Sequence, residues 1–416
     1  MIRPTILDIN KAKVILYPIK QFPSIHINIT IKAGSWYETG PQWGAFHYLE
    51  HLIFEGSTKY PTNRHLENFK QEHGINLNGS TSGSNMSFWL NLPDFKLNQG
   101  LEIIDQLIFH PLLDPSQFKK EISVITQEYF QFWDKPYNRF YKKFNDLILG
   151  ENNFLNRHSI GQPEFIAQLS QSDLQTLHSR YFQPQNLIIS FVGNFNPTEI
   201  KNKITPILQR QTNNFSPKLP QTSIPKIKQK TLNYHDKIDQ SYLTISWVKK
   251  KKLSFSDKVC LGITSSIIAG NTNSILVQKI RQKLGLVYHI NSSFSHSQDI
   301  NFFEIWASSE NKNLNQIIDT IQFEIKKFIQ QGITTKKFNQ IRQYMNYRTL
   351  MSDDSPGKIS QNLSRQLFHH HKIYLPQDLV NIANKITLDD FMSVSRDLIN
   401  PENTITATMT PTKPES

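Results

Sequence analysis

Five consecutive residues, His47-Tyr48-Leu49-Glu50-His51, combine two side chains that can bind a metal ion with one that can accept a proton. On a helix, His47 and His51 would project from the same face, one turn apart. Glu50 would lie beside them, within reach of a water molecule bound to the ion. This order, His-x-x-Glu-His, is the inverted form of a zinc-hydrolase motif. The segment therefore predicts a zinc site with its own general base.

The residues around the motif predict the helix that the site requires. Apolar residues recur at three- and four-residue spacing from Ala45 to Ile53, and Gly56 followed by Pro61 is a helix stop. Two histidines and a glutamate on a helix are equally compatible with a solvated polar face when they are considered alone. The apolar stripe would hold this helix against a core, which favours a metal site in a cleft.

A catalytic zinc ion also needs a third protein ligand and an open position for water. Glu128, in the segment 118–130, is the best candidate, and Glu121 lies two helical turns before it on the same face. An ordinary amphipathic helix explains this pair of carboxylates better when the pair is taken alone. His158 is a weaker alternative ligand, because it lies in a turn region rich in Gly and Asn.

At these positions the chain resembles the inverted-motif zinc peptidases that include pitrilysin, insulin-degrading enzyme and mitochondrial processing peptidase. The resemblance runs from Gly44 to Pro61 and includes the trailing Gly-Ser-Thr-Lys-Tyr-Pro. It implies that His47, His51 and Glu128 bind one zinc ion per chain. It also implies that Glu50 is the catalytic base and that Glu121 helps to orient the site.

The segment 78–88 resembles a strand of the same family that carries Asn-Ala-x-Thr and whose edge receives the substrate backbone. The resemblance implies that the substrate is bound along four residues, Asn78, Gly79, Ser80 and Thr81. Gly79 stands where the family usually has Ala, and Met86 stands where it usually has Thr. We therefore expect the side-chain contacts of this strand to differ from the family pattern.

A second landmark lies far along the chain, where residues 280–288 resemble the family's Leu-Arg-x-x-x-Gly-Leu-x-Tyr. In that family the Arg and the Tyr bind the substrate carbonyl and stabilise the tetrahedral intermediate. The resemblance gives these catalytic roles to Arg281 and Tyr288. An Arg and a Tyr seven residues apart mean little in isolation, but Gly285 and Leu286 are in register with the family pattern.

The length of 416 residues is sufficient for two domains of about 200 residues each. The order strand, helix, strand, strand, helices, strand occurs twice along the chain. It predicts an α+β fold of two similar domains, each a mostly antiparallel sheet covered by helices on one face. We place a catalytic zinc-binding domain at 1–208, a Pro-rich linker at 209–229, and the second domain, with Arg281 and Tyr288, at 230–416.

Local patterns predict how the first domain is built. Residues 13–18 and 24–32 alternate like an antiparallel strand pair, and residues 187–193 predict the strand that closes the sheet. A long helical region at 115–149 carries both candidate carboxylates. These elements would position the zinc helix on one face of the sheet.

Composition excludes several other classes of protein. Cys260 is the single cysteine, which rules out an intramolecular disulfide and a cysteine-based zinc site. The N-terminus has no apolar signal region, and no apolar run is long enough to span a bilayer, so we expect a soluble cytoplasmic protein without membrane insertion. The net charge of +12 lies largely in Lys-rich stretches without a nucleic-acid motif, so we expect no nucleic-acid partner. The run His369–His371 is interpreted as a solvated helix end.

Together these features predict a zinc-dependent endopeptidase that cleaves extended peptides or unstructured segments inside a dimeric chamber. Larger members of the family enclose a chamber with four such domains, so a two-domain chain needs a second chain of similar size. A homodimer is the simplest arrangement, with Arg281 and Tyr288 of one protomer completing the partner's site. A heterodimer with a related subunit stays open. A non-catalytic assembly subunit, as in respiratory-complex core proteins, is the alternative.

Overall fold

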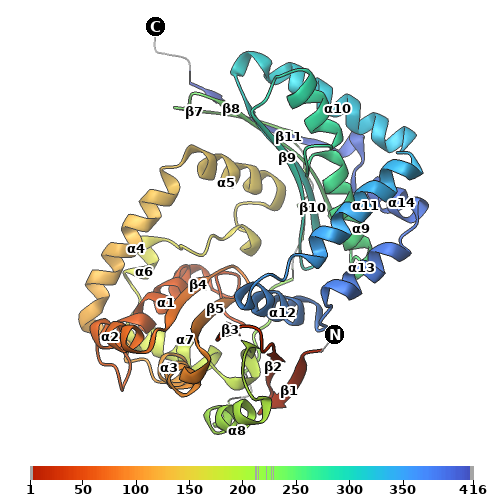
Figure 1. The fold of residues 1–416 in the computed structure, drawn as a ribbon. Helices are drawn as coiled ribbons and strands as arrows, with labels where there is room; N and C mark the ends of the chain where they lie inside the picture. Colours follow the sequence, from red (N-terminus) through yellow and green to blue (C-terminus); the bar gives the residue numbers. More distant parts are fainter. Residues whose placement is uncertain are drawn as a thin grey trace. The chain divides into compact units, whose positions relative to one another are not determined.

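The computed structural model describes residues 3–210, 213, 215–221, 223–225, 227 and 229–412. The chain forms two compact units, each built around its own β-sheet (Figure 1). Counting the described residues alone, the first unit comprises 3–132, 157–210, 213, 215–221 and 352–375. The second unit comprises 133–156, 223–225, 227, 229–351 and 376–412.

The units are therefore not the contiguous ranges that the sequence suggested. The segment 133–156 belongs to the second unit, and the segment 352–375 belongs to the first. Each segment contains a helix whose apolar side chains pack on the sheet of the unit it joins. No local pattern shows which sheet such a helix will cover. The expected linker at 209–229 lies partly outside the described residues.

The first sheet has the strand order β1-β2-β6-β3-β5-β4 and is antiparallel except for the pair β2–β6. Its strands are β1 (Thr5–Ile9), β2 (Ala12–Pro18), β3 (Ser24–Ile31), β4 (Asn76–Thr81), β5 (Met86–Pro93) and β6 (Leu187–Gly193). The expected pairing of 13–18 with 24–32 is wrong, because β6 lies between β2 and β3. All seven residues of β6 are buried, as a central strand requires.

The second sheet repeats this arrangement with the order β7-β11-β8-β10-β9, in which β7 and β11 are parallel. Its strands are β7 (Thr231–Asp236), β8 (Ser241–Lys250), β9 (His289–Ser297), β10 (Ile300–Ser309) and β11 (Ile405–Pro411). In both sheets one parallel pair is followed by three antiparallel pairs. The prediction of an α+β fold with two similar sheets is confirmed.

Helices cover one face of each sheet, and one further helix packs on the other face. In the first unit the main layer contains α1 (Ala45–Glu55), α2 (Asn63–His73), α3 (Leu97–Phe109), α4 (Phe118–Trp133), α6 (Pro163–Ile166), α7 (Gln171–Tyr181) and α8 (Pro197–Leu208). In the second unit it contains α9 (Phe255–Ile268), α10 (Leu314–Gln331), α11 (Thr335–Leu350), α13 (Pro376–Lys385) and α14 (Leu388–Leu398). The additional helices are α12 (Pro356–His370) on the first sheet and α5 (Pro136–Leu149) on the second.

The helical region predicted at 115–149 is two helices rather than one. The helix α4 ends at Trp133, and α5 begins at Pro136. Proline lacks the N–H that a helix interior requires, and it favours the first position of a new helix. The first unit includes α4 up to Phe132, and α5 belongs to the second unit, so the chain leaves the first unit next to this break.

The structure also shows where the histidine run and the single cysteine lie, and whether a described helix could span a membrane. The run of histidines ends α12, where His369 and His371 are exposed and His371 adopts a left-handed conformation with φ of 53°. Cys260 is buried. Within the part of the chain that the structure describes, no helix has the length and apolar character needed to cross a membrane.

Candidate metal centre

The helix α1 carries the His-x-x-Glu-His motif on one face and packs its other face into the first core. Six of its residues are buried, namely Ala45, Phe46, Tyr48, Leu49, Leu52 and Ile53. The helix begins after Gly44, whose φ of +102° favours glycine. A Cβ atom at Gly44 would lie 2.8 Å from the Cα of Gly161, so the start of the helix also depends on this close backbone approach.

A buried carboxylate that no motif predicted holds the first turn of α1. Glu38 is 5% exposed and accepts hydrogen bonds from the backbone N–H groups of Gly44 and Phe46, each at 2.8 Å. Arg157 donates to the carbonyl oxygen of Glu38. Burial raises the pKa of Glu38 to about 7, against the opposing effect of the two N–H donors and Arg157. Glu38 acts as a helix cap from six residues upstream, a spacing that no capping pattern describes.

Replacing this carboxylate should weaken the fold of the first unit. Glu38→Ala leaves two buried N–H groups without their acceptor, so the free energy of unfolding should fall by about 1–3 kcal/mol. Urea denaturation measures this change. The control is Glu72→Ala, which alters an exposed residue of α2 and should change the stability by less than about 0.5 kcal/mol. Equal stability of the two variants would contradict the capping role.

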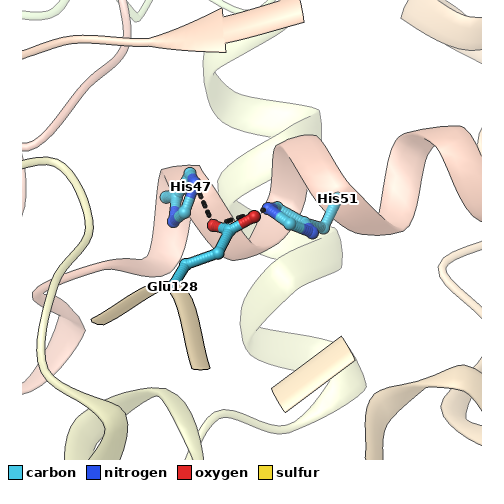
Figure 2. A group of neighbouring side chains, drawn as sticks. All are labelled: His47, His51 and Glu128. Carbon is cyan, nitrogen blue, oxygen red and sulfur yellow. Dashed lines mark ion pairs between the residues drawn. The ribbon is translucent and has the colours of Figure 1, made fainter. Parts of the chain in front are cut away.

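The two histidines of α1 and Glu128 of α4 converge on one point (Figure 2). Glu128 Oε2 lies 3.6 Å from His47 Nε2 and 3.6 Å from His51 Nε2. The imidazole ring centroids are 4.8 Å apart. Within the described residues, these three form the one group of His, Cys, Asp or Glu side chains whose ligand atoms all lie within 4.8 Å of one another.

This group fits a zinc ion in both chemistry and spacing. Two imidazole nitrogens and one carboxylate oxygen are the donors of many catalytic zinc sites. Atoms bonded to one tetrahedral zinc ion lie roughly 3.3–3.6 Å apart, given bond lengths of about 2.0–2.2 Å. The 3.6 Å separations agree with that range. Burial lowers the pKa of His47 to about 3, so its imidazole is neutral and has a lone pair for a metal. Glu128 is 42% exposed, which leaves one side of the group open to solvent.

Glu121 lies behind this group and contacts His51 rather than the point of convergence. Its side chain is 6% exposed, and its Oε2 lies 3.1 Å from His51 Nδ1. A carboxylate at Nδ1 places the ring proton there and leaves Nε2 free to bind a metal. Lys120 Nζ lies 3.2 Å from the other oxygen of Glu121. Glu121 therefore contacts His51 from the side away from the point of convergence, where a carboxylate would orient the ring for a metal.

Glu50 faces the edge strand β4. Its Oε2 accepts a hydrogen bond from Thr81 Oγ1 at 2.5 Å. A Cβ atom at Gly79 would lie 3.0 Å from Glu50 Oε1, so the glycine leaves space for the carboxylate. Burial raises the pKa of Glu50, and the bond from Thr81 opposes this shift. Asn78 and Ser80 are exposed on the same strand.

Four positions that the sequence analysis singled out are not part of this metal group. Arg281, in the π-helical turn η6 (Val277–Lys283), and Tyr288 belong to the second unit, where the guanidinium lies 5.9 Å from the tyrosine ring. Tyr288 is 81% exposed. His158, the alternative ligand, accepts a hydrogen bond at Nδ1 from the N–H of Ile160 at 3.2 Å and is not part of the metal group. Met86 is fully buried in the core.

Comparisons with known proteins show which family the chain resembles. Residues 14–153 match the family model described as insulinase (peptidase family M16), and residues 168–345 match the one described as peptidase M16 inactive domain. An uncharacterized zinc protease of Bacillus subtilis, YmxG, is 24% identical and covers 94% of this chain and 95% of its own length. The mitochondrial-processing peptidase subunit beta of Dictyostelium discoideum is 21% identical, covering 90% of this chain and 81% of its own.

The fold is also found among solved structures. The crystal structure of a peptidase M16 inactive domain from Pseudomonas fluorescens superposes with a TM-score of 0.88 and 15% identity. The match covers 100% of this chain and 99% of that chain. The match therefore includes both units of the fold.

Proposed function

The chain belongs to the insulinase family, peptidase M16, and we propose that it is a zinc-dependent endopeptidase. The observation that carries the proposal is the convergence of His47, His51 and Glu128, with Glu50 on the same helix. The family model described as inactive matches residues 168–345, which contain none of these four residues. The relatives named zinc proteases support the same activity.

The chemistry of the site divides between the metal and the protein. A zinc ion held by His47, His51 and Glu128 would polarise the scissile carbonyl and lower the pKa of a water molecule. Glu50 accepts a proton from the attacking water and transfers it to the leaving amine. The hydroxyl of Thr81 holds one oxygen of Glu50 in place for this step.

The edge of the first sheet supports a substrate in extended conformation. The strand β4 is the last strand of its sheet, so its outer backbone groups can pair with a peptide. Residues 78–81 lie on this strand next to Glu50. Backbone pairing depends little on side chains, so we expect extended peptides and unstructured segments of varied sequence as substrates. Metal analysis and digestion of a mixed peptide library by the purified chain test this proposal directly.

Completion of the site in a dimer is part of the same proposal. Tyr288 would donate a hydrogen bond to the developing oxyanion and Arg281 would hold a substrate carbonyl. The high exposure of Tyr288 supports a role toward a bound molecule. We propose that these residues of one protomer serve the partner's metal site in a homodimer. The alternative is a heterodimer with a related chain. It is supported by the relative from Dictyostelium discoideum, which is named as the beta subunit of a peptidase.

Tyr288→Phe should reduce kcat while it leaves zinc content and stability unchanged. Loss of one oxyanion donor costs roughly 10²–10³ in rate. Mixing this variant with Glu50→Gln protein, under conditions that exchange subunits, should restore part of the activity. One site of the mixed dimer would then contain both an intact Glu50 and the partner's intact tyrosine. Absence of recovery after demonstrated exchange would mean that each chain completes its own site or that the partner is another protein.

A further inference from the structure

The second unit contains a pocket that the proposed mechanism does not use. Along β8 and β10, residues with odd numbers such as Ile245, Phe303 and Ile305 face the apolar core of the unit. The alternating residues form the opposite face of the sheet. The helix α5 covers one part of that face with Phe140 and Phe144. Beside this covered part lies a cavity of about 630 Å³.

A buried carboxylate forms the polar centre of this pocket. Glu304 of β10 is 8% exposed, and its one hydrogen-bonding partner among the described residues is Tyr141. The hydroxyl of Tyr141 donates at 3.1 Å to Oε2 and lies 3.4 Å from Oε1. Burial raises the pKa of Glu304. A carboxylate removed from water requires a positive partner or several donors, and one neutral hydroxyl supplies only part of this.

Aromatic rings surround the carboxylate. Tyr137 stacks on Tyr141 with ring centroids 6.0 Å apart and lies 5.8 Å from the ring of Tyr242. The indole of Trp306 and the imidazole of His289 form the far side, 4.6 Å apart. Such rings present their negative faces to a cation and stabilise it when it is removed from water.

A second polar atom in the pocket also lacks a partner. Thr244 lines the pocket and is 2% exposed, and its hydroxyl has no hydrogen-bonding partner among the described residues. No lysine or arginine is among the described residues that line the cavity. The pocket therefore offers a carboxylate, a free hydroxyl and aromatic faces, a set that suits an organic cation carrying N–H donors.

We propose that this pocket binds the positively charged side chain of a lysine or arginine in a peptide. The ammonium or guanidinium group would pair with Glu304 and donate to Thr244, and the aliphatic stem would lie against Trp306 and Tyr137. General attraction of cations to the protein does not explain such binding, since the chain has a net charge of +12. The assignment of the peptide as a substrate rests on the proposed function, whereas binding itself does not.

The test is a binding measurement on the full-length Glu50→Gln protein, in which peptides are not consumed. Two acetylated and amidated ten-residue peptides of alanine and serine differ in one central residue, lysine or norleucine. Calorimetry should show that the lysine peptide binds about tenfold or more tightly, as a charged hydrogen bond in a buried site implies. Equal affinities would overturn the inference.

Matched variants test whether the preference for the lysine peptide over the norleucine peptide comes from this pocket. Adding Glu304→Gln should abolish the preference for lysine. Adding Glu310→Gln should retain it, because Glu310 is 68% exposed, pairs with Lys312 and lies just beyond the same strand. If Glu304→Gln fails to fold, Tyr137→Leu leaves the carboxylate in place and should weaken lysine binding about 2- to 5-fold. If Glu304→Gln and Tyr137→Leu both kept the full preference for the lysine peptide, the proposal would be contradicted.

A free amine could supply the same chemistry as a peptide side chain. The compound n-butylamine should therefore compete, but only at concentrations about tenfold or more above the peptide. If n-butylamine and the lysine peptide competed at equal concentrations, the pocket would be assigned to free amines. That result would overturn the inference that it binds a peptide side chain. Cleavage of peptides by the unmodified chain without any lysine preference would remove the assignment of the bound peptide as a substrate and leave the proposed endopeptidase function intact.

Discussion

Glu50→Gln protein is expected to keep its zinc and its fold and to lose nearly all turnover. A glutamine has the shape of glutamate and can still accept the hydrogen bond from Thr81, but it cannot take a proton from water at neutral pH. General base catalysis contributes about 10²- to 10⁴-fold in rate, so kcat should fall by that factor. Peptide hydrolysis, measured at matched zinc content, gives the comparison.

A control variant at a second glutamate of the same unit shows whether the loss of turnover comes from Glu50 itself or from the loss of any negative charge. Glu67 of α2 pairs with Lys70 at 2.7 Å and lies at the surface. Glu67→Gln should therefore leave kcat within about twofold of the parent. Retention of activity within a few fold in Glu50→Gln would exclude Glu50 as the base, whatever the control shows.

Glu128→Gln should lower zinc occupancy far below one ion per chain. With its carboxylate gone, two imidazoles remain, and a catalytic site normally has three protein ligands. Glu121→Gln should have a smaller effect, about 10- to 100-fold in zinc affinity, because Glu121 contacts His51 Nδ1 rather than the metal position. His158→Ala should keep its zinc. Metal analysis after dialysis against a chelator ranks the three variants.

The order of the zinc affinities of these three variants shows which residue is the third ligand. A protein that keeps its zinc in Glu128→Gln and loses it in His158→Ala would move the third ligand to His158. A loss in Glu121→Gln as large as that in Glu128→Gln would mean that Glu121 is itself a ligand.

The sequence predicted local elements well because their signals are local. The apolar spacing of α1 and its stop at Gly56 predicted the zinc helix, which the structure has at Ala45–Glu55. The repeated order of strands and helices predicted two similar sheets, and the matching strand orders confirm them. The family resemblance, drawn from residues 44–61 and 280–288, is confirmed by the matched family models.

Other features depended on contacts between distant residues and left no local signal. The insertion of β6 between β2 and β3 is a choice of neighbour that alternation of side chains does not encode. Glu38 reaches the start of α1 through a loop, so its capping role is visible only in space. Glu304 was not a candidate because a single acidic residue in a strand has no pattern of its own until its neighbours are known.

The helix α12 has a consequence for how the protein folds during synthesis. It lies against β6 and β3 of the first sheet (Figure 1), yet it lies far beyond β6 along the chain. Its residues Ile359 and Leu363 pack with Ile188 and Val192 of β6. At about 5–20 residues per second, a ribosome needs roughly 10–40 s to make residues 194–375. During that interval the apolar side chains of Ile188 and Val192 would have no cover. The nascent chain should therefore need a chaperone until α12 emerges, and a fragment that ends before residue 352 should aggregate.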